Sequence, residues 1–237
     1  MLFLAVFCGF LAENIREHQV EHKRERMYMV SLLNNLEEDS IMLLSRSIAI
    51  TKQTAGLDTV MEALRYSLRE KKALAYAYVM YLKYGQITIN AHFNENTIIQ
   101  LKNAGEFRII RKDEVINMLN SYEFTKFIVT KDNKDITTLI MELEKNQANS
   151  IFDFTTGAAI LKLSEVNPLG LNTDSLINIA INDPLVLIDK NEELIPAFRN
   201  NIRSLKSLDN DYGNWVKSCL QKNSELRALI KKEYHLK

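Results

Sequence analysis

The feature that most constrains the fold is a long stretch without a helix breaker near the start of the chain. No proline or glycine occurs between Leu11 and Ala55, and no proline precedes Pro168. Proline removes a backbone donor and clashes with the preceding helical turn, so a sequence without it can stay helical. We predict one continuous helix over residues 3–53, about 75 Å long at 1.5 Å per residue.

Apolar residues within this predicted helix recur mostly at spacings of three and four, which place them on one helical face. We expect that face to be buried against other helices. Its members are Met29, Leu32, Leu33, Leu36, Leu43, Leu44 and Ile48.

The first twelve residues, MLFLAVFCGFLA, are apolar and carry no charged side chain. As a helix they reach about 18 Å, whereas a membrane span needs roughly 20 residues. A secretory signal or a lipoprotein signal at Cys8 fits poorly, because no basic region precedes the apolar run. The run ends in a dense cluster of charges, so we interpret it as the C-terminal part of a transmembrane helix whose beginning is absent from this chain. Burial in a protein core is the alternative that its length allows.

The charged cluster that follows is balanced in sign. Between Glu13 and Arg26, four basic residues accompany four acidic ones. The side of the membrane on which the rest of the chain lies therefore does not follow from the basic residues of this flank. We divide the chain into an apolar segment (1–12), a charged juxtamembrane stalk (13–28) and a helical soluble domain (29–237).

The overall charge gives no indication of a nucleic-acid partner. Lysine plus arginine and aspartate plus glutamate number 30 each, so no excess of positive charge is available to attract phosphates. The two cysteines, Cys8 and Cys219, are too few for a framework of disulfides.

The predicted fold class is all-α, with the long N-terminal helix continuing into an irregular antiparallel helical bundle. Gly56 is expected to end the first helix. Thr59 and Glu62 have the spacing of a capping box that would open a second helix, with Gly85 as the residue that ends it. The segment QITINAHF that follows is interpreted as a connector.

Four further helical patterns follow. The first opens with Thr97 and ends at Gly105, and the second begins at Asp113 and continues, after a break or kink at residues 130–135, into ITTLIMELEKNQA. A short helix capped by Thr173 or Asp174 lies in the irregular stretch 152–196. The last pattern runs from about Glu192 to the end of the chain, with Gly213 as a candidate interruption.

One motif suggests metal chemistry. His18, Glu21 and His22 spell H-x-x-E-H, which is the zinc-protease signature in inverted order. A catalytic zinc needs a third protein ligand, and the candidate, Glu70, is flanked by basic residues that oppose a bound dication. We therefore interpret the two histidines as part of a solvated stalk and predict no metal ligands.

Other catalytic and cofactor motifs are absent from the sequence. It contains no G-x-x-x-x-G-K-[ST], no G-x-G-x-x-G and no G-x-S-x-G. The acidic segments NNLEEDS (34–40) and DNDYGN (209–214) lack the spacing of a calcium loop. We accordingly predict no catalytic residue, no cofactor and no enzymatic activity.

Three segments together resemble a family of uncharacterised bacterial membrane-anchored proteins. They are GFLAENIREHQVEHKRERMYMVSLLNNLEEDS (9–40), TIIQLKNAGEFRIIRKDEVINMLNSY (97–122) and LRALIKKEYHL (226–236). The second is similar to a Thr-x-x-x-Leu-Lys-x-(Ser/Ala)-Gly-x-x-Arg-x-Ile pattern of that family. The resemblance implies a single-pass protein of the bacterial cytoplasmic membrane with a helical soluble domain and no assigned activity.

Three hypotheses for function follow from the sequence. The preferred one is a membrane-anchored, non-enzymatic helical protein that acts as a sensor-like or scaffolding module, with a homo-oligomer or an unknown protein as its partner. The second is a metal-dependent hydrolase that uses His18, Glu21 and His22. The third is a soluble helical interaction domain that buries residues 1–12 in a dimer seam.

Overall fold

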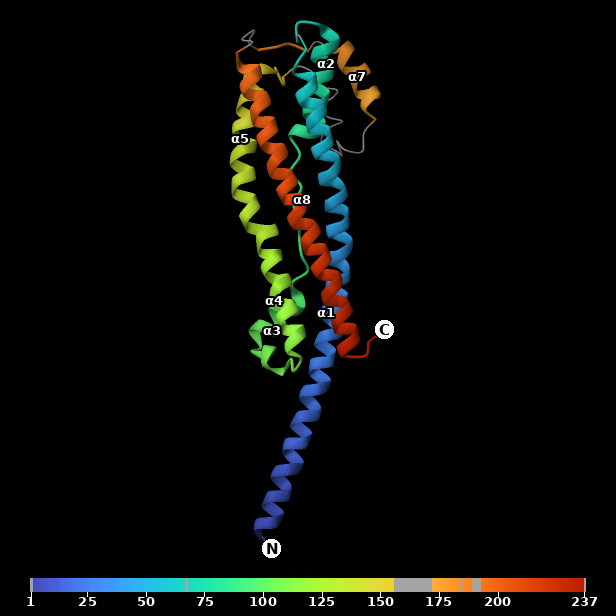
Figure 1. The fold of residues 1–237 in the computed structure, drawn as a ribbon, viewed down its shortest axis with the longest axis vertical. Helices are drawn as coiled ribbons and strands as arrows, with labels where there is room; N and C mark the ends of the chain where they lie inside the picture. The colour runs from blue at the N-terminus through green and yellow to red at the C-terminus, as the bar shows by residue number, and fades with distance from the viewer. Residues whose placement is uncertain (1, 67, 156–171, 184, 189–192, 237) are drawn as a thin grey trace. The chain divides into compact units, whose positions relative to one another are not determined.

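The computed structural model describes residues 2–66, 68–155, 172–183, 185–188 and 193–236 (Figure 1). Within these residues the chain is all-α, which confirms the predicted fold class. The described part contains no strand, and its only β-type pairing is an isolated bridge between Phe152 and Leu187. No helix in the described part has a stretch that is both long and apolar enough to cross a membrane.

Seven α-helices are described, together with two π-helical segments and one 3-10 segment. The α-helices are α1 (Leu2–Ala63), α2 (Lys71–Met80), α3 (Asn96–Asn103), α4 (Asp113–Phe127), α5 (Asn133–Ile151), α7 (Thr173–Asn182) and α8 (Leu194–Glu233). The π-helical segments are η1 (Tyr81–Gly85) and η3 (Ile128–Asp132), and the 3-10 segment is η2 (Glu106–Ile109).

The chain forms two compact units, each built from separate stretches of sequence. The first unit comprises Met1–Leu43, His92–Lys126 and Ser218–Lys237. The second unit comprises Leu44–Ala91 and Phe127–Lys217. The division into segments 1–12, 13–28 and 29–237 stays a prediction.

The long N-terminal helix is confirmed, but it ends later than predicted. Helix α1 continues through Gly56 to Ala63, and α2 begins only at Lys71, so the break at Gly56 and the capping box at Thr59 are wrong. A Cβ atom at Gly56 would lie 2.1 Å from the ring of Tyr84. Glycine is therefore present because a neighbouring ring packs directly on the α1 backbone.

The two glycines predicted to end helices behave differently. Gly105 follows α3 with a φ of +64°, in the left-handed region that glycine tolerates, as predicted. Gly85 is the last residue of η1, which directly continues α2, and a Cβ there would approach the ring of Tyr81 to 2.5 Å. The helical stretch therefore ends at Gly85 as predicted, but Gly85 lacks a positive φ and also leaves room for the Tyr81 ring.

Other boundaries follow local chemistry. The predicted kink at residues 130–135 overlaps η3, a π-helical turn between α4 and α5. Helix α7 is capped by the side chain of Asn172, which accepts from the Ser175 amide at 3.0 Å, so neither Thr173 nor Asp174 is the cap. Gly213 does not interrupt α8. Part of the irregular stretch 152–196 lies outside the described residues.

In the first unit, α1 packs with α4 and α8. Asp39 contacts Tyr122 of α4, and Leu36 contacts Asn223 of α8. Leu36 contacts Asn223, whereas Glu25, nearer the start of α1, contacts Tyr234, nearer the end of the chain. Helix α8 is therefore antiparallel to α1. Helix α4 runs in the same direction as α1 in this unit, which departs from a strictly antiparallel bundle (Figure 1).

The buried face of α1 is partly as predicted. Met29, Leu36 and Leu43 are buried, but Leu44 and Ile48 are exposed, so their assignment to the buried stripe is wrong. Because a helix has 3.6 residues per turn, apolar residues stay on one face only if steps of three and steps of four residues alternate. After Leu43 the buried stripe next includes Ile50, whereas Leu44 lies on a different face.

The second unit has an aromatic core. Tyr81 packs on Phe198 with ring centroids 5.3 Å apart, and Tyr78 packs on Phe152 at 5.7 Å. Edge-to-face pairs of this kind stabilise a core beyond the area that they bury. They join η1 and α2 to α8 and to the end of α5.

The contact at Gly56 gives the first testable prediction. Gly56→Ala should lower the free energy of unfolding by about 1–3 kcal/mol, because the new methyl group overlaps the Tyr84 ring. Urea denaturation followed by circular dichroism measures the change. Gly9→Ala is the matched control, because no atom lies within 4 Å of a Cβ at that helical position. Equal stability of the two variants would contradict the packing role of Gly56.

Candidate functional site

The H-x-x-E-H segment lies on an exposed part of α1, and an arginine occupies the space next to it. Arg111 Nη2 lies 3.1 Å from His18 Nδ1 and 3.0 Å from Glu21 Oε2. A guanidinium between the histidine and the carboxylate repels a metal cation. It also occupies His18 Nδ1 and Glu21 Oε2, two atoms that would otherwise be available to bind the metal. Glu70, the carboxylate considered as a further ligand, is the N-cap residue of α2.

His22 is directed toward another carboxylate. Its Nδ1 atom lies 3.5 Å from Glu25 Oε2, at the limit of a hydrogen bond. No group of three or more histidine, cysteine or acidic side chains in the described part is placed to hold a metal ion. The H-x-x-E-H residues thus form ion pairs and hydrogen bonds with neighbouring side chains.

Glu25 is the centre of a buried polar cluster just beyond the histidines. Its Oε1 atom accepts hydrogen bonds from the Tyr234 hydroxyl at 2.5 Å and from the Arg111 backbone amide at 2.8 Å. Arg26 donates to the Tyr234 carbonyl at 2.7 Å. Burial, followed by the hydrogen bond to Glu25, raises the pKa of Tyr234. The cluster fastens the end of α8 and the segment before α4 to α1.

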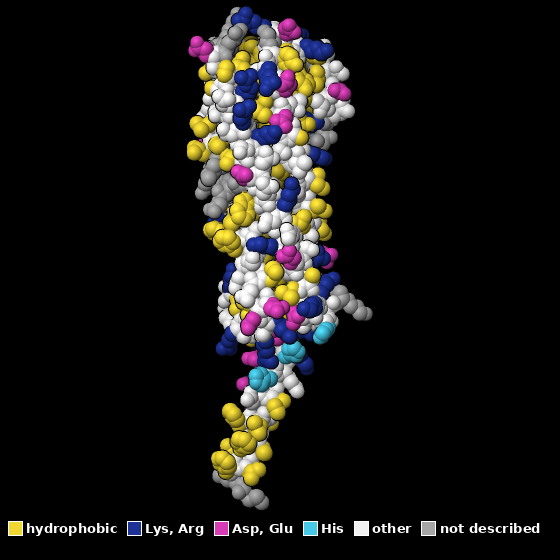
Figure 2. Space-filling model, in the orientation of Figure 1, with side chains coloured by type: hydrophobic (Ala, Val, Ile, Leu, Met, Phe, Trp, Pro, Cys, Tyr) yellow, Lys and Arg dark blue, Asp and Glu magenta, His cyan; other side chains and the backbone are white. Residues whose placement is uncertain are grey.

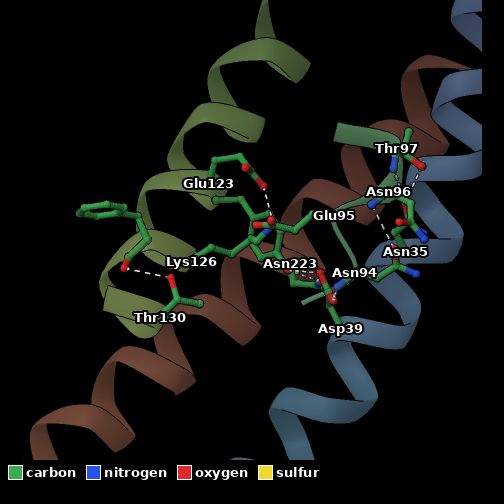
Figure 3. Close-up of polar contacts among 12 residues, drawn as sticks. Asn35, Asp39, Asn94, Glu95, Asn96, Thr97, Glu123, Lys126, Thr130 and Asn223 are labelled. Atoms are coloured by element: carbon green, nitrogen blue, oxygen red, sulfur yellow. Dashed lines mark hydrogen bonds and ion pairs between the residues drawn. The ribbon is translucent and has the colours of Figure 1, made fainter. Parts of the chain in front are cut away.

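A second buried cluster is centred on Asp39 of α1 (Figure 3). Asp39 is 3% exposed, and its two oxygens accept from the Asn94 amide at 2.8 Å and the Tyr122 hydroxyl at 2.9 Å. Burial raises the pKa of Asp39, and the two hydrogen bonds oppose that shift. One carboxylate thereby joins α1 to α4 and to the connector before α3.

Asn223 of α8 completes this second cluster. Its Nδ2 atom donates to the Leu36 carbonyl at 2.9 Å and to the Tyr122 hydroxyl at 3.3 Å. The Tyr122 hydroxyl therefore accepts from one side chain and donates to another, so α1, α4 and α8 share one chain of hydrogen bonds. Such bonds satisfy polar groups that would otherwise be costly to bury.

Lys126 lies beside this cluster with its charge surrounded. Its Nζ atom is 2.9 Å from Glu123 and 3.4 Å from Glu95. The same atom lies 5.2 Å from the ring centroid of Phe93, within the range of a cation–π contact. The ammonium is thus held by two carboxylates and an aromatic face, which is an arrangement for structural stability.

The start of α3 is attached to α1 by a third set of polar contacts. The Thr97 hydroxyl hydrogen-bonds to the Asn35 side chain and lies 2.8 Å from the Ser31 hydroxyl. The Thr97 side chain is therefore engaged with α1 (Figure 3).

Cys219 does not have the environment of a reactive thiol. It is buried in the first unit, and burial raises its pKa to about 12. The thiolate is the nucleophilic form of cysteine, and it is disfavoured in this setting.

The second unit contains two buried acids, Glu144 of α5 and Asp209 of α8. Burial raises the pKa of Glu144 to about 8 and that of Asp209 to about 7. Neither oxygen of Glu144 has a hydrogen-bond partner of good geometry in the described part, although the Tyr81 hydroxyl is close enough to influence its pKa. Both acids are therefore favoured in the neutral form at mildly acidic pH.

Comparisons with known proteins do not extend this picture. No family model matches the chain, and neither a curated protein nor a solved structure matches it. The resemblance of residues 9–40, 97–122 and 226–236 to a membrane-anchored family remains a prediction.

The clusters bring together residues that no sequence motif identified. In the sequence, Asp39 lies 83 residues from Tyr122, and Tyr122 lies 101 residues from Asn223. The one signal in the sequence was the position of Asp39 between Leu36 and Leu43 of the apolar stripe. An acid on a face that is otherwise buried needs partners, which the sequence alone does not name.

The role of Tyr122 can be tested by removing its hydroxyl. Tyr122→Phe leaves one oxygen of Asp39 without its donor, so the free energy of unfolding should fall by about 1–3 kcal/mol. Tyr66→Phe is the control, because Tyr66 is largely exposed. Urea denaturation monitored by circular dichroism compares both variants with the natural sequence, and a change in Tyr122→Phe no larger than in the control would contradict this role.

The buried acids predict a dependence of stability on pH. A carboxyl whose pKa is higher in the folded than in the unfolded chain keeps its proton when folded, so its contribution is fully present below about pH 4.5 and is lost as pH rises to about 8. Stability should fall between about pH 4.5 and pH 8, by on the order of a few kcal/mol at most for Glu144. Thermal denaturation across this range measures the fall.

Glu144→Gln should flatten that dependence, because the amide cannot ionise. Glu142→Gln on the exposed side of α5 is the matched control and should keep the natural slope. A slope that stays unchanged in Glu144→Gln would show that other groups cause the pH dependence.

Proposed function

We propose that this protein is a membrane-anchored, non-enzymatic helical protein in which the apolar start of α1 inserts into a bilayer. In this proposal the rest of the first unit is held next to the membrane surface and serves as a sensor-like or scaffolding module. The resemblance noted in the sequence supports the bacterial cytoplasmic membrane as its location. The observation that carries the proposal is the exposure of the apolar residues at the start of α1.

The apolar side chains at the start of α1 have no protein core to fill. Every side chain that the structure describes between Phe3 and Val20 is exposed, and Phe3 is 82% and Phe10 69% exposed. Phe3 and Phe7 stack on each other, with ring centroids 6.4 Å apart. Contiguous exposed apolar surface of this kind is typical of sites that contact a membrane or another protein.

The surface changes character abruptly after this apolar part. Figure 2 shows hydrophobic side chains at the start of α1, followed by histidines and by a zone of mixed charge. Apolar residues next to histidine and charged residues match the transition from hydrocarbon to headgroups and water. Transfer of a Phe, Leu or Val side chain from water is worth about 1.5–3 kcal/mol, so six such residues supply roughly 10 kcal/mol or more for insertion.

The stalk is firmly connected to the rest of the first unit. The Glu25 cluster lies at the end of the charged stretch, and it joins α1 to Arg111 and to Tyr234 through the contacts described above. A helix held in this way would carry a displacement from the membrane side to α4 and α8. This supports a sensor-like or scaffolding role over a passive tether.

Vesicle flotation tests the membrane proposal. The full chain should float with vesicles of phosphatidylethanolamine and phosphatidylglycerol, and Phe7→Asp/Phe10→Asp should reduce the floating fraction at least tenfold. Ile99→Asp/Phe124→Asp is a matched control, because it changes two exposed apolar residues elsewhere in the first unit. Natural protein that stays at the bottom of the gradient, or equal loss in both variants, would contradict the proposal.

The same exposed residues also fit a second candidate function. In a soluble interaction domain, residues 1–12 would pack against another copy and leave the membrane aside. Sizing without lipid distinguishes the two, because Phe7→Asp/Phe10→Asp would then convert a dimer to a monomer. The metal-dependent hydrolase has no comparable support, since Arg111 contacts both His18 and Glu21.

A further inference from the structure

A second stripe, which contains four exposed apolar residues, runs along α1 on the side away from its buried face. Its positions alternate at spacings of three and four, as in the heptad repeat of a coiled coil. In heptad notation, the a positions are Val20, Met27, Asn34 and Ile41. The d positions between them are Lys23, Val30 and Glu37. We call this set the outer seam.

Every residue of the outer seam is exposed in the first unit. Met27 is 71% and Ile41 68% exposed, although both are large apolar side chains. At roughly 100° per residue, the outer seam lies nearly opposite the buried stripe of Met29, Leu36 and Leu43. A solvent-facing helix surface is normally polar, so exposed Met, Val and Ile at heptad spacing call for a partner.

The outer seam includes a shallow depression. It is lined by Lys23, Arg26, Met27, Val30, Ser31 and Asn34. In a coiled coil, each a or d side chain enters a hole formed by four residues of the facing helix. The first four lining residues form the hole for a facing a residue, and Met27, Val30, Ser31 and Asn34 form the next hole, for a facing d residue.

We propose that the outer seam is the interface of a parallel, in-register dimer with a second copy of this chain. Met27 of one copy would enter the first hole of the other, and Val30 would enter the second. Val20 and Ile41 are β-branched residues at a positions, which favour two-stranded parallel coiled coils. Asn34 at a central a position pairs with its own equivalent only in register, and this fixes the alignment.

The two charged d positions limit the strength of the dimer without preventing it. Glu37 is already paired within its own chain, where Arg227 Nη2 lies 3.2 Å from Glu37 Oε1. Lys23 lies toward the exposed end of α1, where its long side chain can carry the ammonium out to water. We expect association in the micromolar range, which suits a reversible contact. In the sequence, Leu44 and Ile48 continue the spacing, and both are exposed.

The dimer does not depend on membrane insertion. The outer seam begins at Val20, beyond the apolar residues that the membrane proposal uses. A parallel arrangement is nevertheless compatible with that proposal, because it directs both apolar segments toward the same bilayer. An antiparallel pair would direct them to opposite ends.

Disulfide cross-linking tests the orientation of the dimer. Met27→Cys and Ile41→Cys are made singly in full-length Cys8→Ser protein and oxidised in mild detergent, which covers the apolar segment. The two sites are about 21 Å apart along α1, and a disulfide needs Cα atoms within about 7 Å. A parallel, in-register dimer therefore predicts that both variants cross-link to themselves. Self-cross-linking at only one site, as in an antiparallel pair, or at neither site, would overturn the proposal.

Glu114→Cys is the matched control for cross-linking, because Glu114 is exposed on α4 of the same unit. It should remain at least tenfold less cross-linked than the two seam variants. Cross-linking of Glu114→Cys as efficient as at the seam would show random collision and contradict the proposal.

Light scattering tests the seam itself. In detergent, Val30→Glu/Ile41→Glu should weaken dimerisation at least tenfold with unchanged helical content, and Ile99→Glu/Phe124→Glu should leave it unchanged. In lipid-free buffer, Phe7→Asp/Phe10→Asp should still dimerise even if it no longer floats with vesicles. Loss of the dimer in Phe7→Asp/Phe10→Asp, or an unchanged dimer in Val30→Glu/Ile41→Glu, would contradict the outer seam as the dimer interface. This conclusion holds whether or not the protein floats with vesicles.

Discussion

Two buried carboxylates on one face of α1, Glu25 and Asp39, hold the first unit together. Each stands in a stripe of apolar residues, so each must find hydrogen-bond donors on the elements packed against that stripe. Glu25 finds Tyr234 and the backbone of Arg111, and Asp39 finds Tyr122 and the backbone of Asn94. The position of α4, of the end of α8 and of the connector before α3 thus follows from the need to satisfy two acids.

This dependence explains why the sequence predicted the helices better than their contacts. The absence of proline and glycine after Leu11 predicted α1, and Gly105 predicted the end of α3, because both signals act through the local backbone. Gly56 was misread because it leaves room for the ring of Tyr84, which is distant in sequence, whereas the ring that packs on Gly85 belongs to Tyr81 of the same segment. A local pattern does not distinguish a glycine that ends a helix from one that admits a neighbour.

The polar clusters were beyond prediction for the same physical reason. Asp39 lacks any motif with Tyr122 or Asn223, and only the fold brings the three side chains together. The prediction that Leu44 and Ile48 belong to the buried stripe was wrong for a different reason. Apolar residues at spacings of three and four occur on two separate faces of α1, and the sequence does not show which face is buried. One seam of α1 is filled by its own chain, and the other, with Met27 and Ile41, faces outward.

The contrast between the two cysteines has a practical consequence. Cys219 is enclosed in the first unit and resists ionisation, whereas Cys8 is exposed among the apolar residues at the start of α1. A maleimide fluorophore or spin label would therefore attach to the natural chain at one place. Under the membrane proposal, that place would lie in the bilayer, where the polarity and oxygen accessibility around the label report immersion depth. The unaltered protein would then carry its own attachment point for measuring insertion.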